Sequence, residues 1–193
     1  DPEVVFVTDA GRILAYNHDG TQLWQSAKFD LAGPFIGSND DELDFVTQTS
    51  TPAISDMNAD GTPEVIVGRV IVNGANGNTL GVGSRGIGSV AEVGTTSFAV
   101  DLDGDGNQEV VTGNATYRRD GSIVHQRNAS DGYVAVANFD SDPQGEIVVV
   151  RNGEVAVFHH NFDRLWGPVA LGSGAGGPPT VADFDGDGEP EIG

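Results

Sequence analysis

Four nine-residue segments of the sequence repeat one arrangement of oxygen-bearing side chains. Each segment has Asp or Asn at positions 1, 3 and 5 and Glu at position 9, and the segments span residues 56–64, 101–109, 138–146 and 183–191. The four glutamates recur at intervals of 37 to 45 residues. A period in this range is typical of repeat architectures, in which each repeat is one supersecondary unit that packs against its neighbours. We therefore expect the chain to fold as a series of similar units.

Short runs of strand-forming residues lie between the acidic segments in a constant order. A small apolar stretch such as Ala53–Ser55 precedes each segment, and a β-branched run such as Val65–Val67 follows it. Two further runs flank a turn, as Ile13–Tyr16 and Gln22–Trp24 flank Asp19-Gly20. Asp-Gly and Asn-Gly pairs at such places predict hairpins with a type I′ turn, in which both central residues have positive φ. No sustained helical periodicity is present, so we predict an all-β chain with four short antiparallel strands per unit.

The acidic segments and their surroundings resemble a known family of repeats. The pattern D-x-[DN]-x-[DN]-G-x-x-E, together with the glycine-rich run from Gly172 into the loop that ends at Gly188, is similar to the FG-GAP/VCBS repeats, which also build the head of integrin α subunits. The resemblance implies a β-propeller, usually seven-bladed, with calcium loops between the first and second strands of its blades. It covers nearly the whole chain, with repeat units at about 3–63, 64–108, 109–145 and 146–190. An insertion at about 27–50 is the part that the repeat does not explain.

The chain starts and stops within copies of its own repeat. Asp1-Pro2-Glu3 matches positions 7 to 9 of a further copy, and the last residues follow directly on Glu191. We therefore expect about four blades' worth of strands from a larger propeller, with neighbouring blades of a longer chain as partners. The alternative is a closed four-bladed ring, in which strands from residues 3–26 join the strand at 179–182.

The acidic segments carry the donor set of a calcium site. Side chains at positions 1, 3 and 5 of a tight loop converge on one point, and Ca²⁺ takes six to eight oxygen ligands. Glycine at position 6 lets the chain reverse, and position 7 and the glutamate complete the shell. The absence of Cys and of paired His disfavours zinc. We predict up to four calcium sites, with ligands from Asp56, Asn58, Asp60, Thr62, Glu64, Asp101, Asp103, Asp105, Asn107, Glu109, Asn138, Asp140, Asp142, Gln144, Glu146, Asp183, Asp185, Asp187, Glu189 and Glu191.

Two other kinds of loop share part of this pattern. An EF-hand loop begins in the same way, but its bidentate Glu stands at position 12 and a helix follows. Position 12 is here Val67, Thr112 or Val149, and a β run follows each time, which excludes the EF-hand. A single loop of this kind is equally consistent with an acidic surface turn that binds no metal. Four copies in phase with the predicted strands favour metal binding.

The third loop departs from the pattern. It has Asn138 at position 1 and Pro143 at position 6, where the other loops have Gly. Proline fixes φ near −65° and cannot supply the positive φ of that turn. We therefore predict that the site at 138–146 is the weakest of the four.

The charge of the chain limits its partners. With 29 acidic and nine basic residues, the net charge at pH 7 is −20, which argues against binding to nucleic acids or to anionic membrane surfaces. No apolar run is long enough to insert into a membrane, and the chain has no cysteine. We expect an extracellular or cell-surface module, not an enzyme, that binds a protein or glycan ligand in adhesion. The alternative is a calcium-dependent polysaccharide lyase, for which His125, Arg118 and Arg119 are the candidate residues.

Overall fold

The computed structural model describes residues 3–29, 31, 49–90, 94–172, 174 and 176–193. Its regular elements within these residues are all strands, and none of the described segments forms a helix that could cross a membrane. The strands are β1 (Val4–Val7), β2 (Ile13–Tyr16), β3 (Gln22–Gln25), β4 (Ala53–Ser55), β5 (Glu64–Val67), β6 (Val70–Asn73), β7 (Thr79–Val82), β8 (Phe98–Val100), β9 (Glu109–Val111), β10 (Ala115–Tyr117), β11 (Ile123–Gln126), β12 (Tyr133–Ala137), β13 (Glu146–Arg151), β14 (Glu154–Phe158), β15 (Arg164–Ala170), β16 (Val181–Ala182) and β17 (Glu191–Ile192).

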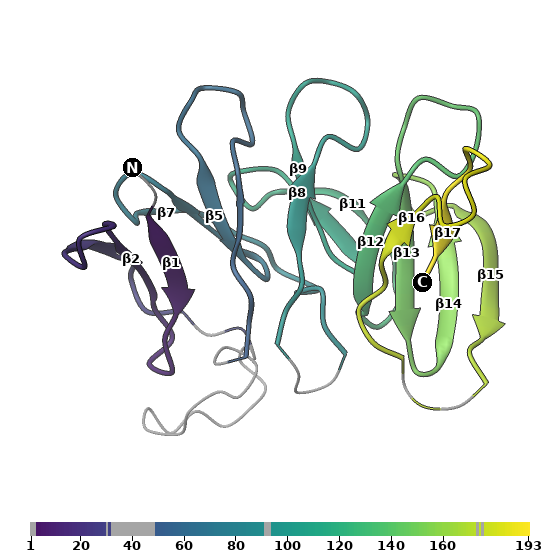
Figure 1. Cartoon of the computed structure of the whole chain (residues 1–193), viewed down its shortest axis with the longest axis horizontal. Coiled ribbons are helices and arrows are strands. Elements are labelled where there is room, and N and C mark those ends of the chain that lie inside the picture. Colours follow the sequence, from purple (N-terminus) through teal and green to yellow (C-terminus); the bar gives the residue numbers. More distant parts are fainter. Residues whose placement is uncertain (1–2, 30, 32–48, 91–93, 173, 175) are drawn as a thin grey trace.

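The strands form separate antiparallel sheets in which neighbours in sequence are neighbours in space. Three sheets have four strands each, β4 to β7, β8 to β11 and β12 to β15, while β1 to β3 and β16 to β17 form smaller sheets. Figure 1 shows the sheets from β1 to β15 standing side by side in chain order, with β16 and β17 overlapping the sheet of β12 to β15 in this view. The all-β prediction with four-stranded antiparallel sheets is thus confirmed. Apart from the sheet of β1 to β3, each sheet takes its first strand from before an acidic loop, so these sheets are offset by one strand from units counted from Glu to Glu.

Successive sheets pack face to face through the strand that follows each acidic loop. In β5, Val65 and Val67 belong to a buried cluster with Ile13 of the first sheet. Ile66, on the opposite face of the same strand, belongs to a cluster with Tyr117 of the next sheet. Because side chains alternate between the two faces of a strand, a strand buried between two sheets needs apolar residues throughout. This explains the continuous β-branched runs after each Glu.

The first strands of two pairs of neighbouring sheets also lie against each other. Contacts join β4 to β8 and β12 to β16. Strands at residues 3–26 do not pair with the strand at 179–182 among the described residues, since β1 to β3 and β16 to β17 are distinct sheets and lie at opposite ends of the molecule in Figure 1. The alternative of a ring closed by that pairing is therefore wrong. Of the predicted insertion at 27–50, residues 30 and 32–48 lie outside the described residues.

The hairpin turns differ from the prediction. Gly20 has φ of 83°, but Asp19 before it is not among the residues with positive φ. The Gly20 N–H donates to Asn17 O at 3.0 Å and the Asn17 N–H to Thr21 O at 2.9 Å, which is the three-residue hairpin loop that ends in a left-handed residue. The same bonds recur around Gly121. The predicted type I′ turn is wrong because the Asp19 side chain accepts the Thr21 N–H at 2.9 Å and stabilises a longer loop.

Candidate metal centre

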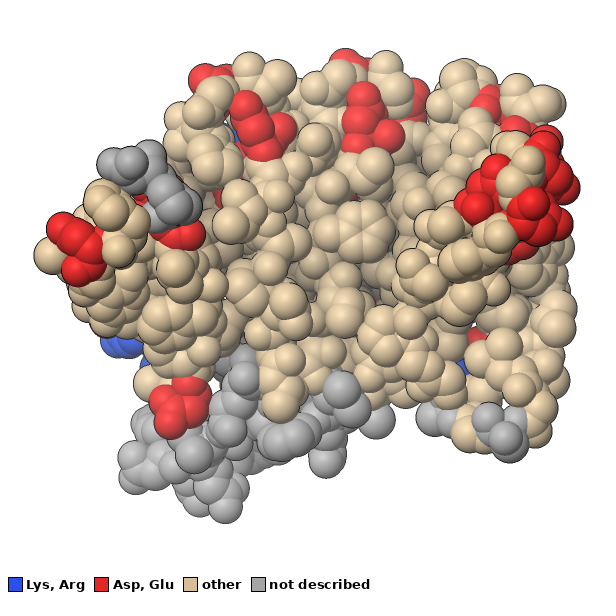
Figure 2. All heavy atoms as spheres, in the orientation of Figure 1, with Lys and Arg blue, Asp and Glu red and all other residues tan. Residues whose placement is uncertain are grey.

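The four acidic loops occupy equivalent places in the sheets. Each connects the first strand to the second: β4 to β5, β8 to β9, β12 to β13 and β16 to β17. In Figure 1 the first three loops rise at the same edge of the molecule and the fourth lies beside the third. Figure 2 shows acidic side chains gathered along this edge. The sequence repeat is therefore also a spatial repeat.

One hydrogen bond is common to all four loops. The Oε2 atom of the position-9 glutamate accepts the backbone N–H of position 2. The donor residues and distances are Met57 at 2.9 Å, Leu102 at 3.2 Å, Phe139 at 2.8 Å and Phe184 at 2.7 Å. Glu64, Glu109 and Glu146 are buried. The bond fixes each carboxylate at the base of its loop and leaves its Oε1 atom for another partner.

The position-1 carboxylates hold the backbone of three loops in the same way. The two oxygens of Asp101 accept the N–H groups of Gly104 and Gly106 at 2.8 and 3.0 Å. Both glycines have positive φ, as the chain reversal requires. Asp56 and Asp183 accept the corresponding bonds from Gly61 and Gly188.

The third loop has a different backbone. Neither Ser141 nor Pro143 has positive φ. The Asn138 side chain is turned to the chain itself, since its Nδ2 donates to Asp142 O at 2.6 Å. The backbone of this loop therefore differs from that of the other three, as Pro143 led us to expect. Whether this loop is the weakest calcium site stays a prediction.

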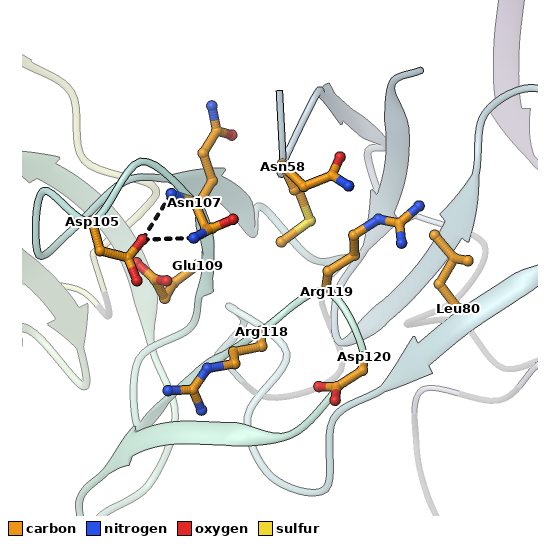
Figure 3. A pocket seen from close by; sticks show the side chains of 10 residues that line it. Asn58, Leu80, Asp105, Asn107, Glu109, Arg118, Arg119 and Asp120 are labelled. Carbon is orange, nitrogen blue, oxygen red and sulfur yellow. Dashed lines mark hydrogen bonds between the residues drawn. The ribbon is translucent and has the colours of Figure 1, made fainter. Parts of the chain in front are cut away.

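The position-5 side chains of all four loops, and the position-3 side chains of the last three, accept backbone N–H groups two residues ahead. Asp103 accepts from Asp105 at 3.1 Å, and Asp105 accepts from Asn107 at 2.7 Å. These bonds with Asn107, which Figure 3 shows, hold the pKa of Asp105 below its usual value. Thr62, Gln144 and Glu189 donate the same bond at position 7 of the other loops. The position-5 side chain thus holds the same turn in each of the four loops.

Three of the loops bring potential ligand atoms together. Atoms within 4.8 Å of one another come from three groups of side chains: Asp101, Asp103 and Glu109; Asp183, Asp185, Asp187 and Glu191; and Asp140, Asp142, Glu146 and His159. Burial is the largest cause of a rise in the pKa of Glu109 to about 7, and the neighbouring aspartates contribute to the same rise. Burial and the nearby Asp140 and Asp142 also raise the pKa of Glu146. A bound cation would relieve this crowding of like charges.

In the first loop, an arginine side chain of a neighbouring sheet lies beside the glutamate. The Arg119 Nε donates to Glu64 Oε1 at 2.8 Å, and Arg119 belongs to the β10 to β11 hairpin of the next sheet. The loop motif gave no sign of this pair. Glu64 is completely buried, whereas a third of the Arg119 side chain is exposed. Among the described residues, the side chains of this loop do not form a group like the other three.

His159 is a site residue that the sequence motif did not indicate. Ile147 pairs with Phe158 in the β13 to β14 register, so the next residues along, Glu146 and His159, face each other across the hairpin. In the sheet of β5 and β6 the residue opposite the loop glutamate is Asn73. Counting strand register from the predicted hairpin was the one signal that could have found His159.

A cavity of about 420 Å³ lies between the first and second loops. Asn58, Asp105 and Glu109 line it together with Arg118 and Arg119, whose side chains point in opposite directions in Figure 3. His125 is not among the lining residues; its ring packs edge-on against His160, with centroids 5.7 Å apart. The three candidate lyase residues therefore do not converge on one cavity.

Comparison with known proteins gives a structural likeness alone. No family model matches the sequence, and no curated protein matches it. The crystal structure of the V. cholerae biofilm matrix protein Bap1 is similar with a TM-score of 0.70 and 22% sequence identity, over 94% of this chain and 28% of that chain. This chain thus spans less than a third of the length of Bap1. The likeness shows that part of Bap1 has the same succession of antiparallel sheets.

Proposed function

We propose that this chain is a calcium-stabilised segment of a β-propeller of the FG-GAP/VCBS type. Its role is non-enzymatic: an extracellular or cell-surface module that binds a protein or glycan ligand in adhesion. The observation that carries the proposal is the recurrence of one loop, with one glutamate bond, along one edge of the sheets.

The arrangement of the sheets supports a propeller. Four-stranded antiparallel sheets follow one another in chain order, and the first strands of two pairs of neighbouring sheets lie against each other. In a propeller, blades of four strands surround a central channel, and the first strand of each blade lies nearest the axis. Buried apolar residues on both faces of β5 and β13 fit blades that are packed between two neighbours.

The donor atoms of the second and fourth loops fit calcium. Asp101, Asp103 and Glu109 offer carboxylate oxygens alone, and so does the group of Asp183 to Glu191. Ca²⁺ is a hard cation that prefers such oxygens. When bound, it supplies the positive charge that these clustered carboxylates lack. In the first loop, Arg119 supplies part of that charge, so we place the strongest calcium dependence in the second and fourth loops.

The extracellular location and the adhesive role are supported by the structural likeness and by the charge of the chain. Bap1 is named as a biofilm matrix protein, which is an extracellular setting. Extracellular calcium fills modules with dissociation constants of about 10⁻⁴ to 10⁻³ M. The acidic edge, in a chain of net charge −20, favours partners that approach with calcium or with cationic groups.

Thermal unfolding tests the calcium proposal directly. Added CaCl₂ should raise Tm, and EDTA should lower it, because calcium binds the folded loops and not the unfolded chain. MgCl₂ at the same concentration is the matched control, since Mg²⁺ keeps more of its waters. A Tm that calcium and EDTA leave unchanged would refute the proposal.

The lyase alternative has its own test. Arg118 and Arg119 lie at a cavity beside the second loop, so acidic polysaccharides are the substrates to try. A lyase releases products with a new double bond that absorbs in the ultraviolet. Calcium-dependent absorbance that Arg118→Ala abolishes would replace the non-enzymatic role with an enzymatic one.

A further inference from the structure

The third acidic loop faces a nitrogen ligand from another hairpin. The His159 Nδ1 atom lies 3.5 Å from Asp140 Oδ2 and 3.5 Å from Glu146 Oε1. Together with Asp142, these side chains form a group whose ligand atoms all lie within 4.8 Å of one another. It is the one group of the three in the described residues that combines carboxylate oxygens with an imidazole.

An unpartnered buried atom points into this group. Glu146 is completely buried, and its Oε2 accepts the Phe139 N–H at 2.8 Å. Its Oε1 is buried and has no hydrogen-bond partner among the described residues, and the His159 Nδ1 lies 3.5 Å from it. Leaving a buried carboxyl oxygen without a hydrogen bond costs free energy. The equivalent oxygen of Glu64 accepts a hydrogen bond from the Arg119 guanidinium. We therefore expect a cation to be the partner of Glu146 Oε1 as well.

The hairpin holds His159 in place beside the loop. The His159 N–H donates to Asp163 O at 2.8 Å, and the Phe162 N–H donates to His159 O at 2.9 Å. Phe162 is buried and packs edge-on against Phe158. The imidazole is therefore presented by a fixed turn. Its side chain is 29% exposed, which leaves a path from solvent to the group.

We propose that Asp140, Asp142, Glu146 and the His159 Nδ1 bind a divalent transition-metal ion of the zinc class in preference to calcium. Zinc is bound by imidazole nitrogen and carboxylate oxygen, and four protein ligands complete its tetrahedral structural sites. Imidazole favours zinc over the hard cations, which prefer oxygen alone. The loop is also the one of the four with an amide, Asn138, in place of an aspartate at position 1, and the Asn138 Nδ2 donates to Asp142 O. This inference goes beyond the proposed function and does not depend on calcium in the other loops.

Cobalt is the probe for this site because Co²⁺ takes zinc's place and absorbs visible light. Titrating the full chain with Co²⁺ should give one ion with the spectrum of a mixed oxygen and nitrogen site, and Zn²⁺ should displace it. His159→Gln should lower the Zn²⁺ affinity by at least about tenfold, because losing even a residue that only hydrogen-bonds to a metal ligand costs about that much. His18→Gln, His125→Gln and His160→Gln are the matched controls and should leave it unchanged.

The results separate this inference from the calcium proposal. An unchanged Zn²⁺ affinity in His159→Gln, or a cobalt spectrum that depends on His125 or His160, would overturn it. If His159→Gln does not fold, Asp140→Asn at the exposed side of the group should give the same loss, and its failure to do so would equally overturn the inference. If cobalt binding requires His159 while added calcium leaves Tm unchanged, the zinc inference is supported and the calcium proposal is refuted.

Discussion

Arg119 and Glu64 form a hydrogen-bonded ion pair between neighbouring sheets, with Nε to Oε1 at 2.8 Å. The same glutamate accepts the Met57 N–H through its other oxygen, so both oxygens of a completely buried carboxylate have partners. In this loop a guanidinium of the next sheet supplies a positive charge beside the buried glutamate. The pair thereby joins the β5 end of one sheet to the β10 to β11 hairpin of the next.

Removing Arg119 should make the first loop depend on calcium. Arg119→Met leaves the buried Glu64 carboxylate without a cation, which costs about 2 kcal/mol of unfolding free energy in metal-free buffer once the partial exposure of Arg119 is taken into account. Added calcium should recover more stability in this variant than in the unchanged chain. Urea unfolding with EDTA and with CaCl₂ measures both effects.

Arg118→Met is the control for that experiment. Its side chain lines the same cavity but points away from Arg119 (Figure 3). If calcium stabilises all three chains equally, the guanidinium does not stand in for a metal ion at Glu64.

The strands and the acidic loops were predictable because both depend on local pattern. The β-branched run of Val65 to Val67 and the small residues of Ala53 to Ser55 identify neighbouring strands, and these pair as expected. Arg119 and His159 were not predictable from the motif, since each reaches its loop from another hairpin. The positions of these two residues depend on strand register and on how the sheets pack, and a nine-residue pattern specifies neither.

The second loop should depend more on its position-3 aspartate than the third loop does. Asp103→Ala removes a ligand from an all-oxygen group in a loop with both glycines in the left-handed region. Asp140→Ala removes one from a loop distorted at Pro143. In zinc-free buffer, calcium-dependent stabilisation should fall further in Asp103→Ala, by about 1.4 kcal/mol for each tenfold difference in affinity. Equal losses in calcium titrations followed by Tm would contradict the ranking.

The metal-free chain should lose stability as the pH rises from about 5 to about 7. Burial raises the pKa of Glu109 from 4.5 to about 7, so between these values the folded chain holds a proton that the unfolded chain has released. Unfolding free energy therefore falls with rising pH across this window. Glu109→Gln, which cannot ionise, should flatten the profile measured by urea unfolding in EDTA. A profile that Glu109→Gln leaves unaltered would show that Glu109 ionises normally.

Asp131 should be the carboxylate outside the loops whose loss costs most. Its Oδ2 accepts the N–H groups of Ile87 at 2.6 Å and Gly88 at 2.9 Å, and its Oδ1 accepts that of Gly113 at 2.8 Å. Asp131→Asn keeps the shape but turns an NH₂ group toward backbone donors, which should lower the unfolding free energy by about 2 kcal/mol. The matched control, Asp163→Asn, changes an exposed side chain and should move the urea midpoint little. Equal midpoints for the two variants would mean that Asp131 does not hold the connection after β7 against the start of β12.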